Sequence, residues 1–137
     1  MKDHDYLFVY GTLRKDTQSV MHRVLSDNSD LIQKGTFRGK LFMFGGYPGV
    51  VPSSDPEDIV YGEVYRLKDA DSILAILDAY EGCSQDSIQP TEYVRKKVDI
   101  TLNTESCVKA WIYIFNQSIK GLQRIESGDF LDTQSPF

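Results

Sequence analysis

The sequence Tyr6-Leu7-Phe8-Val9-Tyr10-Gly11-Thr12-Leu13 decides the fold, because it joins an apolar run directly to a glycine. A short run of β-branched and aromatic residues predicts a buried strand, and the glycine predicts a sharp turn at its end. Glycine has no Cβ, so backbone N–H groups at the turn can converge on a ligand. We expect the turn to bind a carboxylate or a carbonyl oxygen in this way. An ordinary strand end is the alternative.

Length and charge limit the classes of protein to which the chain can belong. It has 137 residues, of which 41% are hydrophobic and 26% are charged. Such a composition predicts that residues 1–137 form a single globular domain. The formal net charge of −5 argues against nucleic acid or an anionic membrane as the main partner. We expect a small-molecule ligand instead, and the choice between monomer and dimer stays open.

The N-terminal residues and the cysteines indicate a cellular location. Residues 1–5 are polar and lead straight into the first strand, without a signal peptide or an apolar run long enough to cross a bilayer. We therefore expect a cytoplasmic protein in which Cys83 and Cys107 are free thiols. Neither cysteine forms a cluster of metal-ligand spacing with His4 or His22, so no metal is expected.

Hydrophobic periodicity predicts both strands and helices after the first turn. The predicted elements are a short helix at 19–25, strand at 31–44, 50–51 and 59–67, a helix from Asp69 or Asp71 to Tyr80, and a hairpin of strands 92–102 and 108–115. Residues 26–30 should break the first helix, and 45–49 should form a loop. Gly35 and Gly39 should mark bulges or points of close approach. The order predicts an α+β fold with a mixed sheet, either open or curled into a small barrel.

Glu81 lies at the end of the second predicted helix, with Gly82 in the position of a left-handed cap. A carboxylate there opposes the helix dipole, at a cost of about 0.3–1 kcal/mol. The same field raises the pKa of a carboxyl group toward the range that a general base needs. Glu81 is therefore a candidate for acid–base chemistry, and a solvated charge is the alternative. Cys83 and His22 as nucleophile and base have no local signature in their support.

Three further residues are candidates for the lining of a site. Tyr93 and Arg95 are two positions apart in a predicted strand, so their side chains share one face. An exposed Arg95 needs no explanation, whereas an inward one would need a carboxylate partner. Tyr93 and Tyr113 belong either to the core or to a pocket, because a phenol joins an apolar ring to a polar tip.

In chain order, these motifs resemble those of the gamma-glutamylcyclotransferase-like superfamily, and most closely the branch of gamma-glutamylamine cyclotransferases. The segments that carry the resemblance are Phe8-Val9-Tyr10-Gly11-Thr12-Leu13-Arg14, Tyr47-Pro48-Gly49, Val60-Tyr61-Gly62-Glu63-Val64-Tyr65, Leu77-Asp78-Ala79-Tyr80-Glu81-Gly82, Tyr93-Val94-Arg95, Ala110-Trp111-Ile112-Tyr113 and Ser127-Gly128-Asp129-Phe130. They span about residues 6–130. The resemblance implies a small mixed β-barrel flanked by helices.

The resemblance also implies a reaction and its residues. A gamma-glutamyl amide would cyclise to 5-oxoproline and a free amine, with Glu81 as catalytic acid/base and without a cofactor. The substrate would be bound by the turn Tyr10-Gly11-Thr12-Leu13, and Tyr93, Arg95 and Tyr113 would line or brace the cavity. The hypothesis requires the turn and Glu81 to meet at one cavity.

Two alternatives remain beside this enzyme. One is a non-catalytic domain that keeps the cavity and binds a small gamma-glutamyl-like ligand. The other is a hydrolase that depends on Cys83. The amine leaving group stays open, because it would be recognised by the loops at 14–30, 45–58 and 83–91.

Overall fold

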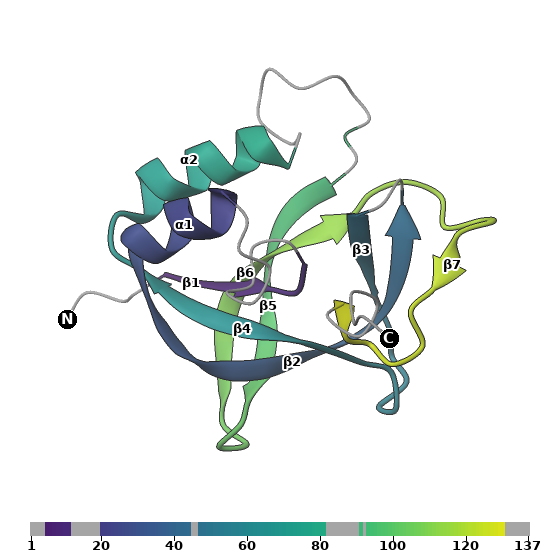
Figure 1. Cartoon of the computed structure of the whole chain (residues 1–137). Helices are drawn as coiled ribbons and strands as arrows, with labels where there is room; N and C mark the ends of the chain where they lie inside the picture. Colours follow the sequence, from purple (N-terminus) through teal and green to yellow (C-terminus); the bar gives the residue numbers. More distant parts are fainter. Residues whose placement is uncertain (1–4, 12–19, 45–46, 82–90, 92, 131–137) are drawn as a thin grey trace, which may run out of the picture.

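The structure is a computed structural model that describes residues 5–11, 20–44, 47–81, 91 and 93–130. The elements of this part of the chain are β1 (Tyr6–Val9), α1 (Val20–Asp27), β2 (Ser29–Phe44), β3 (Tyr47–Pro52), β4 (Ile59–Leu67), α2 (Ala70–Tyr80), β5 (Tyr93–Leu102), β6 (Cys107–Phe115) and β7 (Gln123–Arg124). The strands form one strongly curved mixed sheet, and α1 and α2 lie together on its outer side (Figure 1).

The sheet closes into a small barrel. β1 pairs antiparallel with β4, and β4 pairs antiparallel with β2. β2 pairs with β3, and β3 runs parallel to β6 where Val50 lies opposite Ile114. β6 then lies parallel to β1, where Leu7 is opposite Trp111, and this pairing completes the ring. The α+β class and the small mixed β-barrel flanked by helices are confirmed.

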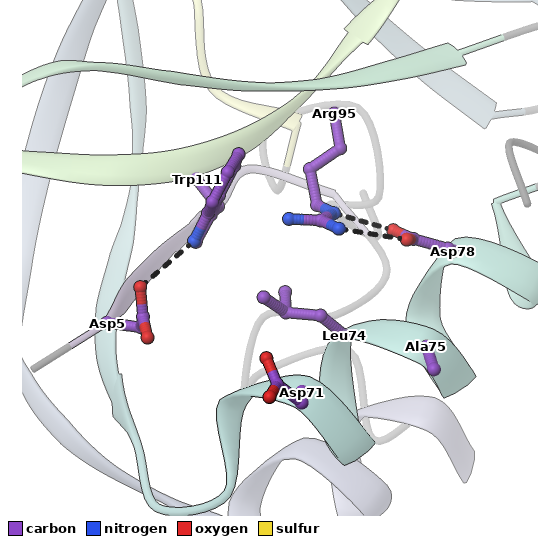
Figure 2. A pocket seen from close by; sticks show the side chains of 7 residues that line it. All are labelled: Asp5, Asp71, Leu74, Ala75, Asp78, Arg95 and Trp111. Carbon is purple, nitrogen blue, oxygen red and sulfur yellow. Dashed lines mark hydrogen bonds and ion pairs between the residues drawn. The ribbon is translucent and has the colours of Figure 1, made fainter.

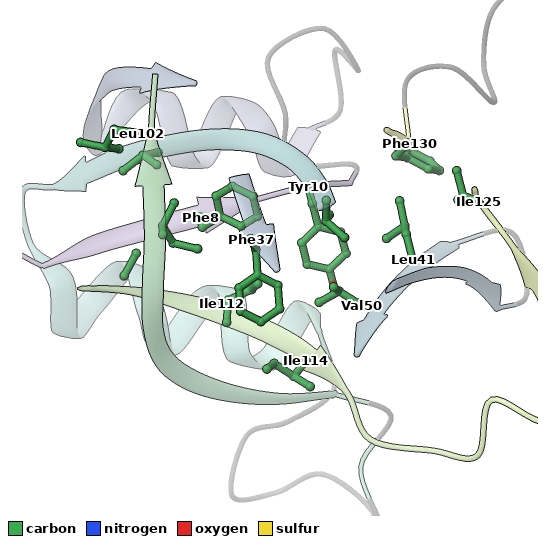
Figure 3. Close-up of a cluster of buried hydrophobic side chains, with 14 residues drawn as sticks. Phe8, Tyr10, Phe37, Leu41, Val50, Leu102, Ile112, Ile114, Ile125 and Phe130 are labelled. Carbon is green, nitrogen blue, oxygen red and sulfur yellow. The ribbon is translucent and has the colours of Figure 1, made fainter. Parts of the chain in front are cut away.

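Apolar side chains fill two separate spaces. One cluster lies inside the barrel and includes Phe8, Leu41, Val50, Ile112 and Phe130 (Figure 3). A second cluster lies between the outer face of the barrel and the helices. Its members include Leu7, Leu25, Tyr65, Ile73 and Leu77. Successive side chains of a strand point to opposite faces, so the strands between the two spaces are apolar on both.

β6 shows this double burial most clearly. Ile112 and Ile114 belong to the barrel interior, whereas Tyr113 and Phe115 belong to the outer cluster. β6 also pairs with β5, β1 and β3. β6 is therefore a central strand of the barrel.

α1 extends two residues beyond its last apolar residue, Leu25, and polar side chains end it. The helix continues to Asp27 and β2 begins at Ser29, so the break predicted within 26–30 does occur there but takes up Asn28 alone. Asn28 Nδ2 donates to the Val24 carbonyl at 2.8 Å, and Ser29 Oγ donates to the Leu25 carbonyl at 2.6 Å. These bonds satisfy carbonyls at the helix end, so the chain passes from helix to strand over one residue.

The bulge of β2 lies away from its glycines. The register against β4 shifts between Leu31 and Gln33, whereas Gly35 pairs regularly with Gly62 of β4 and Gly39 with Pro52 of β3. A Cβ on Gly39 would lie 2.7 Å from the Val51 carbonyl oxygen. Of the two readings offered for Gly39, close approach is thus correct and the bulge is wrong. The predicted loop at 45–49 is also wrong for its second part, because pairing with β2 makes Tyr47–Pro52 a strand.

The β5–β6 hairpin contains a residue in the left-handed region. Glu105 has φ +67°, a conformation that costs a residue with a Cβ about 1–2 kcal/mol. We expect Glu105→Gly to raise the free energy of unfolding by about 0.5–1 kcal/mol, since glycine avoids this cost but loses more entropy on folding. Urea denaturation measures the change. Glu105→Ala is the matched control, because it removes the side chain and keeps the strain. An equal effect of both substitutions would contradict the prediction.

Asp58 links β7 to the barrel through a salt bridge with Arg124. Its carboxylate accepts hydrogen bonds from Ser53 Oγ at 2.6 Å and Arg124 Nη2 at 2.8 Å, and Lys40 Nζ lies 3.9 Å away. The hydrogen bond from Ser53, followed by that from Arg124, holds the pKa of Asp58 below its ordinary value. Charge on Asp58 therefore stabilises the folded chain above the unfolded pKa of about 3.9, and this contribution is lost as the pH falls through the lower folded pKa.

We expect Asp58→Asn to lower the thermal midpoint at neutral pH. The difference from the wild type should shrink below about pH 4, because both chains then lack the charge. Thermal unfolding at a series of pH values measures it. Asp30→Asn, which removes a carboxylate from an exposed pair with Arg66, is the control and should have a small effect at every pH. A constant difference at all pH values would show that charge is not the cause.

Candidate functional site

Tyr10 and Gly11 lie where β1 ends at the rim of the barrel. The Tyr10 side chain points into the barrel and is buried (Figure 3). Its hydroxyl donates to the Tyr113 carbonyl and accepts a long bond, 3.4 Å, from the Val50 N–H. A Cβ on Gly11 would lie 2.6 Å from Pro48 Cγ. Gly11 is thus needed for the close passage of β3, a reason that the sequence did not predict.

Glu81 continues the helical geometry of α2 by one residue. It has φ −82° and ψ −2°, and its N–H donates to the Leu77 carbonyl at 2.8 Å. α2 buries Ile73, Leu74 and Leu77 against the barrel, which leaves Glu81 half-buried at the helix end. At the other end of α2, Asp69 occupies the N-cap position, and its side chain makes no capping hydrogen bond. Helix packing, rather than capping, therefore sets the position of Glu81.

The ends of β1 and α2 lie within electrostatic reach of each other. Burial raises the pKa of the Tyr10 hydroxyl well above its ordinary value, and Tyr93 and the negative charge of Glu81 raise it further. Glu81 and Tyr93 therefore lie near the Tyr10 hydroxyl, although residues 10 and 81 are far apart in sequence. The high pKa also keeps Tyr10 protonated, so its hydroxyl remains a hydrogen-bond donor near neutral pH.

Tyr93 borders the same neighbourhood from β5. It is buried, and its hydroxyl donates to the Pro48 carbonyl at 2.7 Å. Its ring meets the edge of Phe115 at a centroid distance of 5.8 Å. Since Pro48 also packs on Gly11, the segment around Pro48 joins Tyr93 to the end of β1. The structure thus brings together Tyr10, Gly11, Tyr93 and Glu81.

Arg95 and Tyr113 point to a residue that was not among the predicted site residues. Arg95 forms a bidentate pair with Asp78, with Nε at 2.8 Å from Oδ1 and Nη2 at 3.1 Å from Oδ2. The Tyr113 hydroxyl donates to the same Oδ1 at 2.8 Å. The guanidinium also lies 4.3 Å from the centre of the Trp111 ring. Arg95 is thus the inward arginine with a carboxylate partner. Asp78 is the aspartate of the Leu77–Gly82 motif, and this motif could have indicated it as the partner of Arg95.

A separate cavity of about 280 Å³ lies on the outer side of this ion pair. Its lining comes from the start of the described chain, α2 and the β5–β6 hairpin (Figure 2). The lining residues are Asp5, Asp71, Leu74, Ala75, Asp78, Arg95 and Trp111. Neither Glu81 nor Tyr10 lines it, so this cavity is distinct from the neighbourhood that contains the acid–base candidate.

Several predicted features fall outside the described residues. These are His4, Thr12, Leu13, the cap at Gly82, Cys83, and residues 14–19, 45–46 and 83–90 of the three loops named for the leaving group. Cys107 is an exposed free thiol. The His22 and Tyr65 rings pack edge to face, with their centroids 6.2 Å apart. Within residues 5–11, 20–44, 47–81, 91 and 93–130, no group of His, Cys, Asp and Glu could hold a metal ion. No helix in the same ranges is long and apolar enough to cross a membrane.

Comparison with known proteins gives consistent matches along the whole described chain. The model of the family described as gamma-glutamyl cyclotransferase, AIG2-like, matches residues 7–132. The gamma-glutamylcyclotransferase family protein YtfP of Escherichia coli K12 is 35% identical over 127 residues, which are 92% of this chain and 96% of YtfP. The solution NMR structure of E. coli ytfP has a TM-score of 0.63 at 32% identity and covers 95% of this chain and 99% of its own.

A crystal structure of an AIG2-like protein from Mus musculus shows the same fold. Its TM-score is 0.72, and the match covers 91% of this chain and 88% of the mouse chain. The identity is 21%, so this likeness concerns the barrel and its helices alone.

Proposed function

Because the chain belongs to the AIG2-like gamma-glutamyl cyclotransferase family, we propose that it cyclises a gamma-glutamyl amide and releases 5-oxoproline and a free amine. The observation that carries the proposal is the nearness of Glu81 to the buried Tyr10 hydroxyl, whose pKa the charge of Glu81 raises. This nearness supports a single site that contains the carboxylate and the end of the strand that leads to Gly11.

The proposed reaction needs one base and one oxyanion site. Glu81 takes a proton from the α-ammonium of the substrate, and the amine nitrogen attacks the γ-carbonyl carbon of the same molecule. The new C–N bond closes a five-membered ring, and the carbonyl oxygen becomes an oxyanion. Collapse of this intermediate breaks the original amide C–N bond, and Glu81 returns its proton to the nitrogen of the leaving amine. The ring nitrogen, which still carries one extra proton after the attack, releases that proton to water and becomes the neutral lactam nitrogen. No electrons are exchanged, and no cofactor takes part.

The strand end would bind the substrate and its developing charge. In the proposal, N–H groups of residues 11–13 hold the substrate carboxylate or the oxyanion. Tyr10 and Tyr93 give this site a rigid wall, because both hydroxyls already bond to main-chain carbonyls. A rigid wall favours the folded conformer of the substrate that brings amine and carbonyl together.

A panel of gamma-glutamyl amides tests the proposal. Purified protein is incubated with glutathione, several gamma-glutamyl amino acids and gamma-glutamyl-ε-lysine, and 5-oxoproline is measured by mass spectrometry. We expect at least one amide to give 5-oxoproline and free amine in equal amounts. α-Glutamyl isomers are the matched control, because their free amine cannot close the same ring on the scissile carbonyl.

The same panel distinguishes the alternatives. Saturable binding of a gamma-glutamyl compound without any turnover would favour a non-catalytic binding domain. Release of free glutamate in place of 5-oxoproline, abolished by a thiol-blocking reagent, would favour the hydrolase that depends on Cys83. Cyclisation that is indifferent to the reagent supports the proposal.

A further inference from the structure

Asp78 joins α2 to the β5–β6 hairpin through three charge-assisted contacts. Arg95 and Tyr113 are directly opposite each other in the register of β5 and β6, so both side chains project from one face. That face meets the last turns of α2, where Arg95 and Tyr113 bond to the two oxygens of Asp78. The pair is largely covered, since only 23% of the Arg95 side chain and 17% of the Asp78 side chain are exposed.

Asp78 lies three residues before Glu81 on the same helix. The Glu81 N–H bonds to the Leu77 carbonyl, so helical geometry holds as far as Glu81. Side chains three residues apart on a helix are neighbours, with Cβ atoms about 5–6 Å apart. Two acidic groups are therefore adjacent at the negative end of the helix dipole. The last turn of α2 has no basic residue, and Arg95 brings the compensating charge from β5.

Tyr113 extends the same link to the other half of the site. Its hydroxyl contacts Asp78, and its main-chain carbonyl accepts the bond from the Tyr10 hydroxyl. The helix end that carries Glu81 and the strand end that carries Tyr10 are thus both attached to one residue of β6. Without this attachment, the last turn of a helix is the part that opens most easily.

We propose that Asp78, Arg95 and Tyr113 are positioning residues that fix the end of α2 and keep the negative charge of Asp78 compensated beside Glu81. Their meaning for catalysis rests on the proposed function, whereas their effect on Glu81 does not. Among the described residues, the groups that face Glu81 or its helix end include Tyr10 from the end of β1, Tyr93 and Arg95 from β5, Tyr113 from β6 and Asp78 from α2. Asp78 and Arg95 are the charged groups of this set.

Removal of the Asp78 charge and removal of the Arg95 charge should move the pKa of Glu81 in opposite directions. Asp78→Asn removes a negative charge beside Glu81, which favours the ionised carboxylate and lowers the pKa of Glu81. Arg95→Gln removes a positive charge from the same neighbourhood, which disfavours ionisation and raises the pKa of Glu81. Each displacement should be roughly half to one pH unit for a unit charge at this distance in a partly solvated setting. A loss of packing alone would instead move both variants in the same direction.

NMR titration of protein labelled with ¹³C at the glutamate carboxyl groups measures these shifts without a substrate. The Glu81 signal is identified by its absence in Glu81→Gln. The double variant Asp78→Asn with Arg95→Gln restores the net charge of the pair and should return the titration toward that of the wild type. Asp71→Asn is the control for Asp78, because it removes the same group from the same helix. Asp71 lies about 15 Å from Glu81 along the helix, beyond the screening length of about 8–10 Å. Arg66→Gln, from an exposed pair with Asp30, is the control for Arg95.

Opposite shifts in the two single variants, with unchanged controls, support the inference. Shifts of the same sign, or no shift, overturn it. If Arg95→Gln does not fold, Asp78→Asn decides alone, since a downward shift supports the inference and any other result contradicts it. With a substrate of the panel, the acid limb of the pH profile of kcat/KM should shift in each variant in the same direction as the NMR titration of Glu81. Shifts of Glu81 without any 5-oxoproline would refute the proposed function and leave the inference standing.

Discussion

Replacement of Glu81 by glutamine should lower kcat for 5-oxoproline release by roughly two to four orders of magnitude, the usual contribution of a positioned general acid or base. Glutamine has nearly the shape of glutamate but cannot take the proton of the α-ammonium. The substrate therefore stays protonated at the nitrogen that must attack. The helix should be preserved, because the packing of Ile73, Leu74 and Leu77 and the N–H bond of Glu81 do not involve the carboxylate.

The measurement is single-turnover and steady-state kinetics on a substrate of the panel, with circular dichroism as the test of folding. Glu57→Gln is the matched control, because it makes the same change at an exposed glutamate and should retain full activity. Glu81→Asp keeps the carboxylate but shortens the side chain by one methylene. The activity of this variant should therefore lie between those of the wild type and Glu81→Gln. Turnover near that of the wild type in a folded Glu81→Gln variant would remove Glu81 from the mechanism.

The strands and α2 could be predicted because their signals are local. β4 and β6 carry apolar side chains on both faces, and a strand needs this pattern when it lies between two apolar layers. α2 has the helical spacing of Ile73, Leu77 and Tyr80. The hydrophobic pattern alone left the closure of the barrel open, and the resemblance to the family implied it. The pattern could not show the closure, because it depends on β6 meeting β1 at Leu7–Trp111 and β3 at Val50–Ile114. Contacts between segments so far apart leave no periodic pattern in either one.

The candidate site shows the same division between local and distant signals. Glu81 was found because its position on a helix is a local property. The partner of Arg95 was not, because Asp78 reads as an ordinary helix-surface residue until β5 is placed beside α2. The reason for Gly11 was also different from the expected one, since the space that a Cβ would fill belongs to Pro48. Sequence patterns thus identified the residues, and the packing of distant segments determined what those residues contact.

Gly128 should be among the least replaceable residues of the described chain. It has φ +73°, and a Cβ there would lie 1.8 Å from the Ile59 carbonyl oxygen. Its carbonyl accepts the Tyr61 N–H at 2.8 Å, and its N–H donates to the Ile125 carbonyl at 3.0 Å. The same turn places the Phe130 side chain, which is only 1% exposed, in the barrel interior (Figure 3).

Gly128→Ala should therefore lower the free energy of unfolding by about 3–5 kcal/mol, because backbone strain of about 1–2 kcal/mol adds to the partial loss of buried Phe130 and Ile125. Urea denaturation followed by tryptophan fluorescence measures the change. Gly121→Ala is the matched control, since Gly121 has a similar φ of +80° and nothing lies within 4 Å of its Cβ position. That variant should lose only the backbone term of about 1–2 kcal/mol. Equal losses at the two glycines would contradict the prediction, because they would mean that the turn at Gly128 moves away from β4 without cost.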